Sequence, residues 1–162
     1  MPTLIDPRGP RVAATLTSAV LALVLLTAPG TLSTSLLAAQ AAVFAVGALA
    51  GVQHTPYALL FRTLIRPRLD QPAELEDAAP PRFAQGVGLA FALVGLAALL
   101  GGLATLGLVA VGLALVAALL NAAVGLCLGC EVYLLIKRAL HRPGARTNVA
   151  TEPPTPRKVR TP

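Results

Sequence analysis

The sequence predicts an all-α, polytopic membrane protein, and two observations carry that prediction. Apolar residues make up 56% of the 162 residues and charged residues only 12%, with a mean hydropathy of +0.75. Soluble domains carry charge on about a quarter of their residues. The charges also cluster, which leaves two uncharged runs, residues 12–61 and 83–130. A nucleotide-binding α/β domain or a β-sandwich needs polar faces and frequent turns, so these runs exclude both.

Each uncharged run has room for two membrane crossings and a turn, because a helix needs about 20 residues to cross the hydrocarbon core. Pro29-Gly30 divides the first run and Gly101-Gly102 the second, since Pro and Gly end helices. We therefore expect four transmembrane helices arranged as two hairpins, at residues 12–28, 36–53, 83–100 and 106–136. The fourth is too long for a simple crossing, so it must tilt, protrude or begin later.

The basic residues predict the orientation. All 13 Lys and Arg residues lie before the first helix, between the second and third, or after the fourth, and the other two connections carry no charge. The positive-inside rule then places both termini and the central loop in the cytoplasm, with the protein in the plasma (inner) membrane. Topology and anionic lipids explain the basic balance better than nucleic acid, because the chain lacks an aromatic stacking platform. A cleaved signal peptide is disfavoured, since no small-x-small cleavage site precedes Pro29.

The remaining segments complete the domain division. A short cytoplasmic interfacial helix is predicted after Pro56, where apolar residues lie mostly on one face and arginines on another. The acidic stretch at residues 74–77 is expected in a solvated loop, with pairing to nearby arginines or a partner surface as alternatives. Residues 1–142 are assigned to the integral-membrane domain. The tail 143–162, rich in Pro, Thr and Arg, is expected to be a disordered cytoplasmic segment.

One group of polar residues within the apolar runs suggests chemistry. Gln40 and Asn121 are expected to hydrogen-bond across helix interfaces, as amides in transmembrane helices commonly do. Cys127, Cys130 and Glu131 stand at positions i, i+3 and i+4, so they share one face of a helix. Counting back from the basic residues that follow the fourth helix places them in the cytoplasmic half of the bilayer.

The C-x-x-C spacing predicts thiol chemistry. Two cysteines one helical turn apart lie near disulfide distance, and this is the usual spacing of a redox dithiol. Because apolar burial raises the pKa of a thiol and makes it inert, we expect Glu131 to accept and return the protons. A carboxylate within the membrane is unfavourable unless it is neutralised or paired, and His54 and Arg62 are the expected electrostatic partners.

Other roles for the two cysteines stay open. They could be small packing residues, as cysteines in cores often are. Two thiolates and a distant His54 do not fill a zinc site, but they could hold a soft, low-coordinate ion such as copper(I), or four thiols could meet in a homo-oligomer. No cofactor is expected.

Five segments carry a resemblance: residues 5–8, 66–69, 74–77, 81–88 and 125–133. Together they resemble a family of small bacterial integral-membrane proteins, common in actinobacteria and catalogued as a domain of unknown function. The most specific motif is C-x-G-C-x-x-Y, which runs from Cys127 to Tyr133. Members are often encoded beside thioredoxin-like and rhodanese-like proteins, so the resemblance implies work in thiol or sulfur metabolism. It supplies no established catalytic residue.

The functional expectation is a membrane-embedded dithiol, redox-active or sulfur-carrying, that works with a cytoplasmic thioredoxin-like or rhodanese-like partner. Cys127 and Cys130 are the reacting residues and Glu131 the proton relay. One alternative is a transporter of a small sulfur compound or soft metal ion. Another is a non-catalytic membrane scaffold that anchors a cytoplasmic partner by its charged loops.

Overall fold

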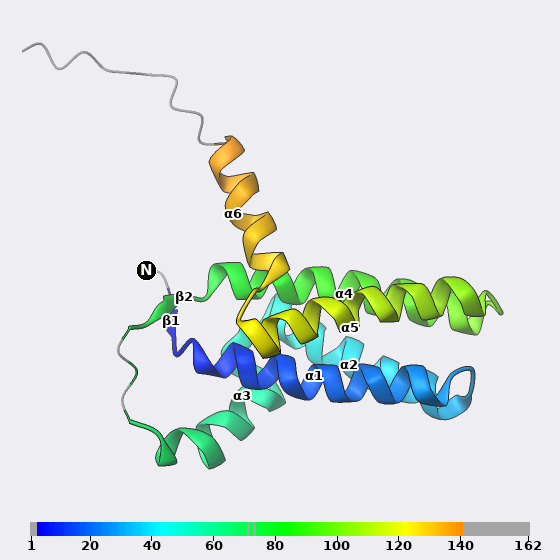
Figure 1. Ribbon diagram of the computed structural model, residues 1–162, viewed down its shortest axis with the longest axis horizontal. Helices are drawn as coiled ribbons and strands as arrows, with labels where there is room; N and C mark the ends of the chain where they lie inside the picture. Colours follow the sequence, from blue (N-terminus) through cyan, green and yellow to red (C-terminus); the bar gives the residue numbers. More distant parts are fainter. Residues whose placement is uncertain (1–2, 71, 73, 141–162) are drawn as a thin grey trace, which may run out of the picture.

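The computed structural model describes residues 3–70, 72 and 74–140, and helices dominate this part of the chain (Figure 1). Four helices are long and apolar enough to cross a membrane: α1 Arg8–Thr27, α2 Thr31–Leu49, α4 Ala79–Leu100 and α5 Ala104–Val124. The prediction of an all-helical chain with four such helices is thereby confirmed. The prediction of a disordered tail at 143–162 lies outside the described residues.

All four helices begin earlier than hydropathy predicts, and the difference is at least one helical turn for the three that begin at Arg8, Thr31 and Ala79. The added turns hold polar residues or proline, which a hydropathy count leaves out. Pro10 lies near the start of α1, and Pro80 near the start of α4. Proline fits the first turn of a helix because the N–H that it lacks has no partner there in any case.

The four long helices form a ring around a small apolar core. α1 packs against α2 and α5, and α4 packs against the same two helices. Glycines allow close approach between α4 and α5: a Cβ added at Gly95 would lie 3.0 Å from Val111 Cγ2, and one at Gly107 would lie 2.7 Å from Leu99 Cγ. Small residues at contacts are the usual means of packing helices within membranes. The core residues are Leu21, Val24, Leu37, Ala41, Phe44, Ala92, Val111 and Ala114.

The expectation of one long helix over residues 106–136 is wrong. α5 ends at Val124, and Gly125 follows with a φ of 75°. Glycine adopts this left-handed conformation without the steric cost of a Cβ, and it commonly ends helices in this way. The N–H of Gly125 donates to the carbonyl of Asn121 at 3.1 Å, so the end of α5 is capped. A separate helix, α6 Leu128–Leu140, then leaves the bundle at a steep angle (Figure 1).

The connection between α2 and α4 is also mostly helical. A 3₁₀ turn at Val52–His54 leads to α3 Pro56–Leu60, which continues as a π-helical turn at Phe61–Ile65. Thr55 caps α3, because its Oγ1 accepts the N–H of Ala58 at 3.2 Å. The prediction that a helix starts at Pro56 therefore agrees with the structure. A 3₁₀ turn at Arg66–Arg68 follows.

Two short strands join the N-terminal segment to this connection. β1 Leu4–Ile5 pairs antiparallel with β2 Glu76–Asp77, and the N–H of Ala78 donates to the carbonyl of Thr3 at 2.9 Å. The prediction of a solvated loop at residues 74–77 is therefore wrong for the backbone of β2. It holds for the side chains, because Glu76 and Asp77 are exposed.

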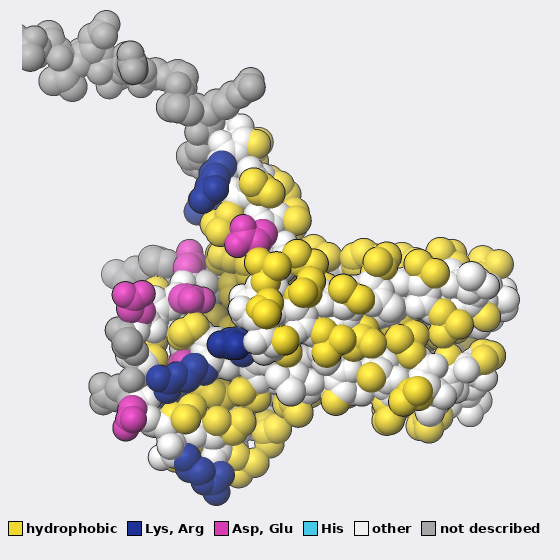
Figure 2. Space-filling model, in the orientation of Figure 1, with side chains coloured by type: hydrophobic (Ala, Val, Ile, Leu, Met, Phe, Trp, Pro, Cys, Tyr) yellow, Lys and Arg dark blue, Asp and Glu magenta, His cyan; other side chains and the backbone are white. Residues whose placement is uncertain are grey.

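Charged side chains of the described residues gather at one end of the bundle, as Figure 2 shows. This charged end is where α1 and α4 begin and where α2 and α5 finish. At the opposite end, the connections at residues 28–30 and 101–103 carry no charged residue. The elements that follow α5, including the motif Cys127–Tyr133, therefore start from the charged end.

Candidate functional site

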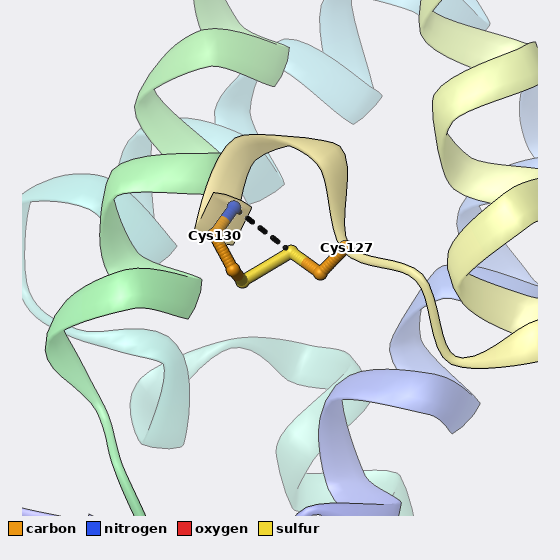
Figure 3. The surroundings of a disulfide bond; sticks show 2 residues. All are labelled: Cys127 and Cys130. Atoms are coloured by element: carbon orange, nitrogen blue, oxygen red, sulfur yellow. Dashed lines mark hydrogen bonds between the residues drawn. A yellow bond between two sulfur atoms is a disulfide. The ribbon is translucent and has the colours of Figure 1, made fainter. Parts of the chain in front are cut away.

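Cys127 and Cys130 form a disulfide at the start of α6, with their Cα atoms 5.2 Å apart. Figure 3 shows the two side chains joined at the turn where α6 begins, beside α4. The backbone N–H of Cys130 donates to Cys127 Sγ at 3.3 Å, and the N–H of Glu131 donates to the carbonyl of Cys127 at 3.0 Å. Cys127 thus stands in the N-cap position, with its sulfur accepting one of the N–H groups that a helix start leaves without a partner.

This position corrects the sequence interpretation, which put both cysteines within one long transmembrane helix. The break at Gly125 moves them to a helix N-terminus instead. The free N–H groups and the dipole of a helix favour negative charge at this end. A thiolate at a helix N-terminus is stabilised and reactive, whereas a thiol in purely apolar surroundings is inert. The geometry therefore favours thiol reactivity in the reduced form of the pair.

Gly129, between the two cysteines, allows α6 to start directly against α4. A Cβ added at Gly129 would lie 2.6 Å from Ala84 Cβ and 2.7 Å from Ala84 Cα. The ring of Tyr133 packs on Phe83 of α4 with centroids 5.7 Å apart. Sequence reasoning quoted Gly129 as part of the motif but gave it no role. The signal that could have found it is a glycine one helical turn before an aromatic residue, since both then face the same neighbouring helix.

A cavity of about 1190 Å³ lies beside the disulfide at the charged end. Both cysteines line it, together with residues from the N-terminal segment, α1, α3, α4 and α5. Arginines and carboxylates stand among apolar side chains in its wall. The polar residues in the wall include Arg11, Gln53, Arg62, Gln85, Asn121 and Glu131.

The structure brings most of the predicted site residues to this cavity. Glu131 lies exposed in the first turn of α6, where a carboxylate is favoured by the helix dipole. Arg62 lines the same cavity, but within the described part of the chain no ion pair joins it to Glu131. His54 is not part of the wall; it is exposed, and its Nδ1 lies 2.9 Å from the carbonyl oxygen of Ala50.

Of the two amides predicted to hydrogen-bond across helix interfaces, Gln40 and Asn121, only Gln40 does so among the described residues. Its side chain is 1% exposed, its Nε2 donates to Thr17 Oγ1 at 3.4 Å, and its Oε1 accepts from the Tyr57 hydroxyl at 2.7 Å. It thereby links α1, α2 and α3. Burial raises the pKa of Tyr57 above its ordinary value of 10.0. The same prediction is wrong for Asn121, whose side chain lines the cavity with no hydrogen bond to the described residues.

Sequence reasoning missed two further amides in the cavity wall, Gln53 and Gln85. The Oε1 atoms of both are buried and have no hydrogen-bond partner in the described part of the chain. A buried oxygen left unpaired costs about 1–3 kcal/mol, so such atoms are uncommon. Neither residue carries a pattern signal, because each stands alone within an uncharged run.

The described residues contain no group of three or more His, Cys, Asp or Glu side chains arranged to hold a metal ion. The two sulfur atoms are bonded to each other, so neither is a free thiolate ligand. The arrangement is thus one of a dithiol–disulfide pair with a carboxylate on the same helical turn and a cavity beside it.

Fold and site together define the class: a helical protein with four helices able to cross a membrane and a C-x-x-C pair at the N-terminus of a further helix. The chain belongs to the family described as a domain of unknown function (DUF4395), whose family model matches residues 5–138. The match includes the disulfide, the cavity wall except Leu4, and most of α6. Comparisons with curated proteins and with solved structures gave no match.

Proposed function

We propose that this protein is a membrane-embedded thiol–disulfide exchanger whose Cys127–Cys130 pair alternates between disulfide and dithiol. The observation that carries the proposal is the location of the pair at the N-terminus of α6, where the N–H of Cys130 donates to Cys127 Sγ. The partner is a thioredoxin-like dithiol protein or, for sulfur transfer, a rhodanese-like protein. The cavity at the charged end provides the space beside the sulfurs in which a partner segment or small thiol compound would bind.

The exchange transfers two electrons and two protons. A thiolate of the partner attacks Cys127 Sγ, the bond to Cys130 breaks, and Cys130 leaves as a thiolate that takes up a proton. The second thiol of the partner then attacks its own sulfur in the mixed disulfide and releases Cys127. The partner becomes a disulfide and the pair a dithiol. The hydrogen bond that the Cys130 N–H donates to Cys127 Sγ favours the release of Cys127, because it stabilises the Cys127 thiolate.

Glu131 is the proposed proton acceptor and donor. Its carboxylate lies on the same helical turn as Cys130 and lines the same cavity. Arg62, which lines the same cavity, is the proposed electrostatic partner of the carboxylate in a complex with substrate. His54 hydrogen-bonds outside the cavity wall and is left out of the mechanism.

The proposed topology is two transmembrane hairpins, α1–α2 and α4–α5, in a bacterial plasma membrane with both termini cytoplasmic. The support is the one-sided distribution of all 13 Lys and Arg residues. α3 and the turn after it are the proposed interfacial helix, because the exposed Leu59 and Leu64 accompany Arg62 and Arg66 there. The disulfide then faces the cytoplasmic side, where reducing partners are found.

Trapping of the mixed disulfide tests the proposal. In Cys130→Ser the Cys127 thiolate attacks the disulfide of an oxidised partner and displaces one of its two sulfurs as a thiolate. The mixed disulfide should accumulate, because no Cys130 thiol remains to attack Cys127 and release the partner, and Cys127→Ser should accumulate much less. The adducts would be identified by mass spectrometry of the purified protein, with the double Cys→Ser variant as the control. A persulfide on Cys127 would favour sulfur transfer over redox exchange. If neither single variant carries an adduct, thiol exchange is excluded as the function.

The cavity supports transport of a small sulfur compound or soft metal ion as a second candidate. Its volume is about 1190 Å³, and Gln53, Gln85 and Asn121 add polar groups to the wall. Transport predicts that uptake or resistance changes on deletion while no thiol adduct forms. A scaffold predicts that the double Cys→Ser variant behaves as wild type in both assays.

A further inference from the structure

α6 lies across the direction of the four long helices. It leaves the bundle after Gly125 and, in Figure 1, runs steeply across α4 and α5 instead of along them. It starts at the charged end and contacts α4 along its first turns, through Gly129 and Tyr133. If the long helices cross a membrane, a helix that runs across them lies along the membrane surface. Its 13 residues span about 20 Å, too short for a crossing of about 30 Å.

α6 is also amphipathic, with the two faces turned in opposite directions. Leu128, Val132 and Leu135 stand at i, i+4 and i+7, and they are 40%, 45% and 59% exposed. Leu128 and Val132 also line the cavity, whereas Leu135 lies outside its wall. Glu131 and Arg138, also seven residues apart, share another face. Figure 2 shows the apolar side of α6 turned toward the uncharged end of the bundle and the basic side turned away from it.

We propose that α6 is an in-plane membrane helix, with its apolar face among the upper acyl chains and its basic end on anionic headgroups. Lipid covers the exposed apolar face, because this face is turned toward the part of the membrane that α1, α2, α4 and α5 would cross. Helices of this kind bury their apolar face about 5–10 Å into the boundary between headgroups and acyl chains. This inference rests on the four spans and is independent of the thiol chemistry.

A single tryptophan tests the position of α6, because the chain contains no Trp of its own. Leu135→Trp reports the apolar face. Leu134→Trp is the matched control: the adjacent leucine stands three residues after Glu131 and four before Arg138, and it lines the cavity instead of the face of Leu135. Leu93→Trp, at an exposed position in the middle of α4, reports whether the bundle is inserted. Each variant is reconstituted into phosphatidylcholine–phosphatidylglycerol vesicles, and its fluorescence is quenched with lipids brominated at shallow or deep acyl positions.

Leu135→Trp should be quenched at least about twofold more than Leu134→Trp, and more by shallow than by deep bromines, as expected for a helix at the boundary. Leu93→Trp should be quenched best by deep bromines. Adding Arg138→Gln to Leu135→Trp should reduce quenching in vesicles with phosphatidylglycerol but not in vesicles without it.

Three outcomes overturn the proposal. Equal quenching at positions 134 and 135 shows that the two faces of α6 do not differ in their contact with lipid. Blue-shifted but unquenched emission from Leu135→Trp shows that protein covers this face, either another copy or a partner. Absence of quenching for Leu93→Trp shows that the bundle does not span the bilayer, so the in-plane assignment of α6 fails with it. Trapping of Cys127 is scored separately and is unaffected by any of these results.

Discussion

Replacing Gly129 with alanine should push α6 away from α4. The new Cβ would lie 2.6 Å from Ala84 Cβ and 2.7 Å from Ala84 Cα, whereas unstrained carbon atoms approach to about 3.5–4.0 Å. The overlap of about 1 Å involves the backbone of α4, so a change of side-chain rotamer cannot remove it. Overpacking of this kind typically costs 1–3 kcal/mol, and we expect the free energy of unfolding to fall by about that amount.

Gly112→Ala is the matched control, because a Cβ at Gly112 in α5 meets nothing within 4 Å. Ala is favoured over Gly in a helix by up to about 1 kcal/mol, so this variant should be slightly more stable than wild type. The two Gly→Ala variants should therefore change stability in opposite directions. Unfolding in detergent micelles, followed by circular dichroism against increasing sodium dodecyl sulfate, gives both free energies.

A Gly129→Ala protein as stable as wild type would refute the close approach of α6 to α4. A second substitution sharpens the test. Ala84→Gly in the Gly129→Ala background removes the overlap with the Ala84 side chain but keeps the overlap with the α4 backbone, so stability should recover only in part. Full recovery would show that the two helices are further apart than the structure describes.

Two further predictions concern Tyr57 and Glu131. Because the pKa of Tyr57 is raised in the folded protein, the unfolded state loses its proton first, and stability should decline as the pH rises above about 10. Tyr57→Phe removes the hydrogen bond to Gln40, so its free energy of unfolding should fall by about 1 kcal/mol at neutral pH. The variant should also lose the part of the stability decline at high pH that comes from Tyr57. A decline as large as that of wild type would contradict the raised pKa of Tyr57. Glu131→Gln should slow reduction of the disulfide by a partner dithiol, by up to about 100-fold if the carboxylate handles both protons. Glu74→Gln, a change at an exposed carboxylate outside the cavity wall, is the control, and equal rates in the two variants would remove Glu131 from the mechanism.

The four long helices could be predicted from the sequence because lipid excludes charge. Uncharged runs of about 50 residues leave few other architectures, and Pro29-Gly30 and Gly101-Gly102 fall at the two turns of the structure. Hydropathy was less informative about where each helix begins, since prolines and polar residues in a first turn are compatible with a helix and lower the hydropathy of the segment.

The break at Gly125 could not be predicted in this way. A single glycine within an apolar run is compatible with a continuous helix, and only the backbone φ of 75° shows that the helix ends there. The error then carried over to the cysteines, whose depth was counted along a helix that does not exist. The C-x-x-C spacing still predicted that the two cysteines lie at disulfide distance, because cysteines three apart meet at a helix start as well as within a helix.

The pairing of β1 with β2 has a practical consequence for fusion proteins. Leu4, Ile5, Glu76 and Asp77 all belong to the cavity wall, and the two segments pair as antiparallel strands. Deleting the first five residues would remove β1, so β2 would lose its pairing partner. One side of the cavity beside the disulfide would then lose its support. A tag fused to the N-terminus would disturb the same β1–β2 pairing. Topology reporters are therefore better inserted elsewhere.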